Sequence, residues 1–194
     1  MRLKIAQAGE PVLRQAARPL AAEEIASDEI QKLIDDLRET MQDAPGVGLA
    51  APQVGLSVQL AVIEDREEYL KDIPADQLRE RERQAVAFHV IINPKIVVAS
   101  DTQAEFFEGC LSLAGFSAIV PRACSVRVEC LDGRGEPKII GATGWYARIL
   151  QHEIDHLQGN LYIDRMQRRT FTSLDNWNRF YKSKPIRAVA DALR

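Results

Sequence analysis

The stretch GWYARILQHEIDHLQG, residues 144–159, decides the fold. Its spacing of apolar and histidine positions, at intervals of three and four, predicts a single helix with these side chains on one stripe. The stripe consists of Trp145, Ile149, His152 and His156. Thr143 is suited to cap the start of this helix, and Gly159 is placed to end it. We therefore expect this helix to lie at the centre of the molecule.

Within that helix, HEIDH at residues 152–156 is the strongest chemical signal. Two histidines four positions apart lie one above the other on the same face, so both can reach one metal ion. Glu153 between them can act on a water at that ion. A core helix whose histidines merely form hydrogen bonds is the alternative, although burying these polar groups without such a purpose is costly.

A catalytic site of this type needs a third protein ligand and one open position. In the familiar peptidases the third ligand follows the motif. Here Tyr162 occupies the position of the third histidine, and residues 157–194 contain no glutamate. The aspartates, His89 and the cysteines remain as candidates. Cys110 stands out among them, because it follows Gly109 in EGCLS, where a glycine lets the backbone pass close to an ion.

A second unusual segment is GVGLAAPQ, residues 46–53. Gly46 and Gly48 allow the backbone to approach a ligand closely. Pro52 stiffens the chain, so the Gln53 amide is presented from a rigid segment, as a donor to a developing oxyanion should be. A plain tight turn between a helix and a strand is the alternative interpretation.

Outward from these motifs, the periodicity predicts an amphipathic helix over residues 23–43 and a buried strand over 58–63. Residues 64–84 carry 13 charges in 21 positions, too many for a core element. We interpret them as an exposed, partly helical excursion, either a solvated loop or a lid. Further strands are expected at 88–98, 117–121, 125–132 and 137–143, with a turn at 132–135.

This order of elements predicts an α+β fold in one domain spanning residues 1–194. We expect antiparallel or mixed sheets to pack around the central HExxH helix, with an N-terminal helix and a C-terminal helical segment.

The composition excludes several classes of protein. Lys and Arg number 25 against 28 Asp and Glu, which argues against a DNA-binding protein. No apolar run reaches the ~18 residues of a membrane span, and the beginning lacks a targeting segment. Three cysteines fit a reducing compartment, so we expect a cytoplasmic protein.

The three motifs resemble the signature blocks of peptide deformylases, in the same order: GVGLAAPQ (46–53), EGCLS (108–112) and QHEIDHLQG (151–159). The similarity extends from GEPVLRQ at residues 9–15 to LYIDR at 161–165. The charged excursion and RRTFT at 168–172 further resemble the mitochondrial-type branch. We find no presequence of that branch in this sequence, so we expect either a bacterial member of the subgroup or a shortened form of a longer chain.

The resemblance implies removal of the formyl group from N-formylmethionyl nascent polypeptides, with release of formate. One divalent metal per chain, Fe²⁺ in the cell and replaceable by Zn²⁺, Ni²⁺ or Co²⁺, is implied together with a bound water. Its implied ligands are Cys110, His152 and His156. Glu153 is implied as the acid–base group, and Gln53 and the Leu111 backbone N–H as oxyanion donors. An endopeptidase and a metal-holding binding module stay open as rival functions.

For the substrate, the resemblance implies that backbone groups at Val47, Gly48 and Gly109 bind the peptide as an added strand. The methionine pocket is implied around Val47, Phe106, Trp145 and Ile149, with His152 at its floor. Trp145 is equally well explained as a core residue at the helix start.

Two further expectations concern charge. The resemblance implies that Glu108 lies just behind the metal ligands, and we expect it to pair with Arg122, because a carboxylate near a metal site must be fixed by a partner. Residues 165–194 hold eight Lys and Arg against two Asp, which suggests transient contact with the ribosome. The alternative is a solvated amphipathic helix around Trp177, Phe180 and Tyr181.

Overall fold

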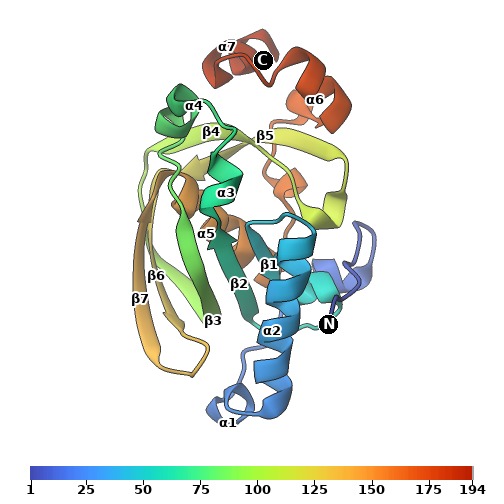
Figure 1. The fold of residues 1–194 in the computed structure, drawn as a ribbon, viewed down its shortest axis with the longest axis vertical. Helices are drawn as coiled ribbons and strands as arrows, with labels where there is room; N and C mark the ends of the chain where they lie inside the picture. The colour runs from blue at the N-terminus through green and yellow to red at the C-terminus, as the bar shows by residue number, and fades with distance from the viewer. Residues whose placement is uncertain (194) are drawn as a thin grey trace.

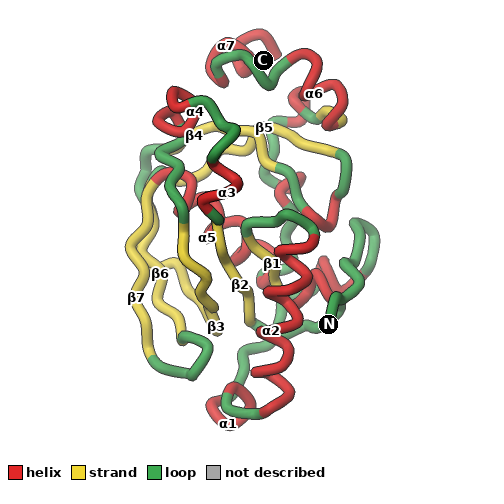
Figure 2. Tube along the Cα trace, viewed as in Figure 1, coloured by secondary structure: helices red, strands yellow, loops and turns green. Residues whose placement is uncertain are grey.

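Two antiparallel sheets form the framework of the computed structural model, which describes residues 1–193. The larger sheet has the order β1-β2-β3-β6-β7 and contains β1 (Gly48–Ala50), β2 (Leu60–Asp65), β3 (Val86–Ala99), β6 (Ser125–Leu131) and β7 (Pro137–Thr143). The smaller sheet has the order β4-β5-β8 and contains β4 (Gln103–Glu108), β5 (Phe116–Ala123) and β8 (Thr172–Ser173). Figure 2 shows these strands in yellow, with helices around them.

The helices of the described residues are α1 (Ala22–Ile25), α2 (Asp28–Asp43), α3 (Glu67–Leu70), α4 (Ala75–Glu80), α5 (Gly144–Leu157), α6 (Leu174–Phe180) and α7 (Ile186–Leu193). The same residues also contain five short 3₁₀ turns, which are η1 (Pro11–Arg14), η2 (Ala51–Val54), η3 (Leu111–Leu113), η4 (Tyr162–Asp164) and η5 (Arg168–Thr170). The expected α+β class, with helical segments near both ends, is therefore confirmed. None of the helices within residues 1–193 has the length and apolar character needed to cross a bilayer.

The larger sheet lies between α2 and α5, with one apolar cluster on each face (Figure 1). Successive residues of a strand point to opposite faces, and β2 follows this rule. Ala61 and Ile63 pack toward α5, whereas Leu60 and Val62 pack toward α2. Both faces of the strand are thus buried, which explains its uninterrupted apolar sequence. The central position expected for the HExxH helix follows from this packing.

The expected helix over residues 23–43 is broken, and this part of the prediction is wrong. α1 ends at Ile25, and the Ser27 hydroxyl accepts a hydrogen bond from the Ile30 N–H at 3.3 Å, which starts α2. A serine cap satisfies the free N–H groups of a new helix, so it divides an otherwise continuous apolar pattern.

Strand β4 was not predicted, because Phe106 and Phe107 are adjacent and both buried. Each face of β4 is covered: Phe107 packs against Trp177 and Tyr181 at the C-terminal end, and the Arg148 guanidinium lies over Phe106. A strand buried on both faces loses the alternation that identifies it in a sequence.

Helix α5 begins and ends where the sequence indicated. Thr143 precedes it in extended conformation, without a side-chain capping bond, so its expected capping role is wrong. Gly159 follows the helix with φ +76°, a left-handed conformation that favours glycine. A Cβ at this position would lie 2.9 Å from the carbonyl carbon of Arg14, so the helix end also packs directly on the N-terminal segment.

Candidate metal centre and active-site cavity

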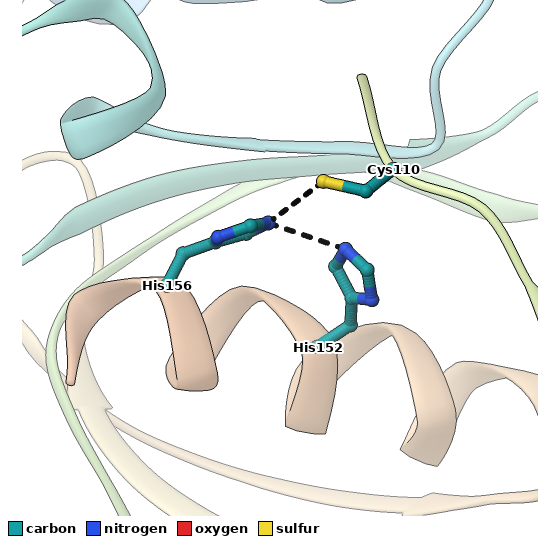
Figure 3. Close-up of side chains that lie close together, drawn as sticks. All are labelled: Cys110, His152 and His156. Carbon is teal, nitrogen blue, oxygen red and sulfur yellow. Dashed lines mark hydrogen bonds between the residues drawn. The ribbon is translucent and has the colours of Figure 1, made fainter. Parts of the chain in front are cut away.

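Three side chains that could hold a metal ion converge at the C-terminal half of α5 (Figure 3). His152 and His156 lie one helical turn apart, and their Nε2 atoms are 3.2 Å from each other. Cys110 follows β4, and its Sγ lies 3.3 Å from the His156 Nε2. All three donor atoms lie within 4.8 Å of one another. A thiolate and two imidazoles in this arrangement fit one tetrahedral divalent ion with an open fourth position.

The orientation of His152 is fixed by Glu108. The His152 Nδ1 lies 3.0 Å from Glu108 Oε2, so this nitrogen donates to the carboxylate and Nε2 faces the other ligands. Burial opposes charge on His152, but the hydrogen bonds to Cys110 and Glu108 raise its pKa well above the ordinary value. Burial lowers the pKa of His156 well below its ordinary value, so that imidazole is neutral. An ion at this centre would take the place of the proton that the raised pKa of His152 favours, because metal binding requires a free ring nitrogen.

Glu108 is in turn held by two buried arginines. Arg122 donates to both carboxylate oxygens at 2.9 Å, which is the pair expected from the sequence. Arg148 donates to Oε1 at 2.6 Å. Burial alone would raise the pKa of Glu108, but hydrogen bonds from His152 and Arg122 outweigh it and lower that pKa far below the ordinary value. The carboxylate next to the metal ligands is therefore permanently charged and fixed.

This network extends to residues that the sequence interpretation missed. Arg122 also contacts Asp155, the fourth residue of HEIDH, and Arg165 donates two hydrogen bonds of 2.7 Å to the same carboxylate. Asp155 lies on the buried side of α5 with 5% of its surface exposed. A buried acidic residue inside the motif was the available signal, because such a residue requires a cationic partner.

Glu153 is buried beside the ligands without a cation of its own. Its Oε2 has no hydrogen-bond partner among residues 1–193, and 3% of the residue is exposed. Burial raises the pKa of Glu153 to about 7. A carboxyl group with a pKa near neutrality exchanges a proton readily at physiological pH.

Gly48 determines where this carboxylate lies. A Cβ on Gly48 would be 2.2 Å from Glu153 Oε1 and 2.8 Å from its Cγ, much closer than atoms can approach. The glycine is required here because the backbone of β1 passes directly over the Glu153 side chain.

We predict that Gly48→Ala moves the Glu153 carboxylate and lowers kcat by about 100-fold, the effect typical of a 1 Å displacement of a catalytic group. The matched control is Gly46→Ala, whose Cβ meets the mobile Leu111 Cδ1 at 2.9 Å, a contact that a side-chain rotation can relieve. Steady-state kinetics of both variants, with their metal content measured, provide the comparison. Equal effects of the two substitutions would contradict the prediction.

Gln53 presents its amide to the same centre. Its Oε1 accepts from the Ala50 N–H at 2.8 Å, which fixes the amide group. Its Nε2 donates to Ser112 Oγ at 3.2 Å and approaches Cys110 Sγ at 3.6 Å. The rigid segment expected from APQ is the 3₁₀ turn η2, with Pro52 in its first turn. The Gln53 amide therefore points toward the ligands from a position set by the backbone.

An apolar cavity of about 440 Å³ opens onto this centre. The centre contributes Gln53, Cys110, His152 and Glu153 to its lining, and the remaining wall includes Val47, Gly48, Gly109, Leu111, Trp145 and Ile149. Phe106 is the exception among the expected pocket residues. It does not line the cavity, because it lies beneath the guanidinium groups of Arg148 and Arg81, 5.3 and 5.6 Å from the ring centre.

A helix that carries HExxH, a third ligand from a distant loop and an apolar cavity at the open position are typical of mononuclear metal-dependent hydrolases. Residues 2–172 match the model of the family described as polypeptide deformylase. The chain belongs to this family, which confirms the resemblance seen in its motifs.

Individual relatives agree with this assignment. Peptide deformylase 1A, chloroplastic, of Solanum lycopersicum is 46% identical over 172 residues, which are 89% of this chain and 62% of that protein. Peptide deformylase 1 of Bifidobacterium longum is 44% identical over 185 residues, 95% of this chain and 82% of that protein. The Met-Ala-Ser-bound class I type b peptide deformylase of Acinetobacter baumannii superposes with a TM-score of 0.76 at 34% identity, covering 86% of this chain and 99% of that one. The chain thus spans less than two thirds of the plant relative's length.

Proposed function

We propose that this chain removes the formyl group from N-formylmethionyl nascent polypeptides and releases formate, with residues 1–194 acting as one catalytic domain. The convergence of Cys110, His152 and His156 beside the buried Glu153 carries this proposal. Membership of the polypeptide deformylase family supports it. So does the similar Acinetobacter baumannii structure, which was solved with Met-Ala-Ser bound.

In this proposal Cys110, His152 and His156 hold one divalent ion. When bound, such an ion supplies Lewis-acid chemistry, polarising the formyl carbonyl and making an attacking water more acidic. The Glu153 carboxylate, which lines the cavity, accepts the proton of that water and delivers it to the nitrogen of the leaving amine. The Gln53 Nε2 and the Leu111 backbone N–H donate to the carbonyl oxygen as negative charge develops, and one such donor contributes about 3–4 kcal/mol.

The peptide backbone is proposed to bind along Val47, Gly48 and Gly109. β1 is the edge strand of the larger sheet, so one of its sides is open to an added strand next to the cavity. Hydrogen bonds to the peptide backbone do not depend on the peptide's side chains, so they allow peptides of many sequences to bind. Selectivity then depends on the first side chain, for which Val47, Trp145 and Ile149 form an apolar wall. Phe106 is not part of that cavity wall.

The test of the function is release of formate. The anaerobically prepared holoenzyme should convert formyl-Met-Ala-Ser to Met-Ala-Ser and formate, as followed by mass spectrometry and a formate assay. It should leave Met-Ala-Ser and an internally cleavable unblocked peptide intact. Cleavage of an internal bond would favour the endopeptidase alternative, and metal binding without formate release would favour a binding module.

We further propose Fe²⁺ as the ion used in the cell. Thiolate and imidazole also accept Zn²⁺, Ni²⁺ and Co²⁺, so the donor set alone does not select iron. We predict that the ferrous form turns over at least about tenfold faster than the zinc form, and that air inactivates it through oxidation of the ion or of Cys110. Turnover of both forms, each with its metal content measured in the absence of oxygen, checks this prediction. Equal rates would contradict it.

We propose a cytoplasmic location and a transient ribosome contact through the basic C-terminal segment. α7 buries Val189 and Ala190 against Phe107 and Ile119, so deleting the segment would expose the core. A charge-reversal variant is the better test. This variant replaces the exposed Lys182, Lys184 and Arg187 together by glutamate.

We predict that this triple variant co-sediments with ribosomes several-fold less than the wild type at low salt, because contact with RNA phosphates depends on cations. Its turnover of formyl-Met-Ala-Ser should not change. Reversal of Lys4 and Arg2, exposed at the opposite terminus, is the control. Unchanged co-sedimentation of the triple variant would end the ribosome proposal.

A further inference from the structure

The end of the charged excursion lies directly on a residue that lines the active-site cavity. We call residues 81–83 the strap. The Arg81 guanidinium carbon is 5.2 Å from the ring centre of Trp145, and that of Arg83 is 5.1 Å from it. Trp145 itself lines the cavity beside Ile149 and His152. Trp145 therefore contributes to the cavity wall while two cations pack on its ring.

Arg83 is anchored independently of the tryptophan. Its Nε and Nη2 donate to the two carboxylate oxygens of Asp65 at 2.8 and 2.9 Å. Asp65 ends β2 and is 1% exposed, so this bidentate pair is fixed to the central sheet. The Arg83 guanidinium consequently has a defined position from which to hold Trp145.

Arg81 is held by aromatic rings instead of by a carboxylate. Its guanidinium also lies 5.6 Å from the ring centre of Phe106, and its buried Nε has no hydrogen-bond partner within the described part of the chain. Burial lowers the pKa of Arg81 from its ordinary value. A half-buried cation with an unpaired, buried Nε is unfavourable, and the two ring contacts offset that cost.

The backbone of the strap packs closely against the start of α5. Glu82 has φ +47°, a left-handed conformation that is strained for a residue with a side chain. Gly144, next to Trp145, has φ +54°, and a Cβ there would lie 2.4 Å from Glu82 Cβ and 2.9 Å from the Arg81 carbonyl oxygen. The strap and the first turn of the helix therefore touch through their backbones.

The indole has no hydrogen bond that could fix it instead. Trp145 Nε1 is buried and has no partner among residues 1–193. The ring is therefore held by packing alone, against the strap on one hand and the apolar cluster between α5 and the larger sheet on the other.

From these contacts we infer that the strap positions Trp145 and thereby selects a long, unbranched first side chain in the substrate. This inference rests on the proposed function. Arg81 and Arg83 are positioning residues, which act on the substrate only through the indole. Without them the ring gains freedom, the wall of the cavity is no longer fixed, and a methionine side chain loses its advantage over a smaller one. The end of the excursion then supports the pocket wall from behind, through Trp145.

The test compares Arg81→Gln with the wild type on formyl-Met-Ala-Ser and formyl-Ala-Ala-Ser. We expect KM for the methionine peptide to rise about fivefold while kcat is retained. A fivefold change corresponds to the free energy of one lost cation–π contact. The alanine peptide should be almost unaffected, so the selectivity ratio falls. Arg81→Lys, which keeps the charge, should restore part of it. Arg79→Met, in the last turn of α4 just before the strap and lining a different cavity, is the control.

A second measurement reports on the ring without turnover. The chain has two tryptophans, so in a Trp177→Phe background the fluorescence comes from Trp145 alone. Acrylamide should quench it about twofold more in Arg81→Gln than with Arg81 present, because the strap no longer covers the ring. If Arg81→Gln does not fold, Arg83→Lys, which keeps a charge facing Asp65, is measured in the same two ways.

An unchanged selectivity ratio or unchanged quenching would overturn the inference. So would an equal loss on both peptides, which indicates a general structural effect. Failure of the wild type to release formate would refute the proposed function instead, and the quenching comparison would still decide whether the strap holds Trp145.

Discussion

Replacing Glu153 by glutamine should lower kcat for formyl-Met-Ala-Ser by about 1,000-fold, within the range expected for loss of a general acid–base group. The Glu153 carboxyl is buried beside the three ligands, and its pKa is raised to about 7 by that burial. Glutamine has almost the same shape but cannot accept or return a proton. The effect should therefore fall on kcat, while metal content and far-ultraviolet circular dichroism stay as in the wild type.

Glu153→Ala is the companion variant, because it removes the side chain altogether. Both variants should be equally inactive if the proton is what matters, and the ion should remain bound in both. The control is Glu136→Gln, an exposed acidic residue in the β6–β7 turn. If Glu153→Gln keeps a tenth of the wild-type rate, Glu153 is not the proton carrier.

The second large effect is expected for Cys110→Ala, which should weaken metal binding by more than about 100-fold, since even changes around a ligand cost 10- to 100-fold. Its Sγ is the one donor that does not come from α5. Inductively coupled plasma analysis after desalting should find one ion per chain in the wild type and almost none in the variant. Turnover should disappear together with the ion.

Thermal unfolding offers a measurement that does not depend on turnover. An ion that binds only the folded state stabilises it, so added Ni²⁺ should raise the Tm of the wild type and leave that of Cys110→Ala unchanged. Cys124→Ala is the matched control, because this half-buried cysteine precedes β6 and lies outside the ligand set. Full metal occupancy of Cys110→Ala would refute the proposed coordination.

The parts of the site that could be predicted from sequence are those that a short stretch of chain determines by itself. The helical repeat puts His152 and His156 on one face of α5 whatever the rest of the chain does. The Glu108–Arg122 pair was also predictable, because a buried carboxylate needs a cation. In contrast, the contribution of Arg148 depends on how β4 and α5 pack, and no local pattern encodes that packing.

The errors have equally physical causes. Phe106 was placed in the pocket although its ring lies beneath Arg148 and Arg81, because the sequence does not reveal which face of a strand buried on both sides meets the cavity. The charged excursion is largely exposed and partly helical, as expected, and carries α3 and α4. At its end, however, the guanidinium groups of Arg81 and Arg83 pack on aromatic rings, which the charge pattern did not indicate.

The hydrogen bond between Glu108 and His152 affects how the protein acquires its ion. Glu108 lies two residues before Cys110 and is itself fixed by Arg122, so protein contacts alone keep the loop and the helix in register. Small zinc domains collapse when a chelator removes their metal, because nothing else holds their ligands together. This chain should instead survive chelation as a folded, refillable apoprotein. The ion it carries at any moment then reflects what the surroundings supply.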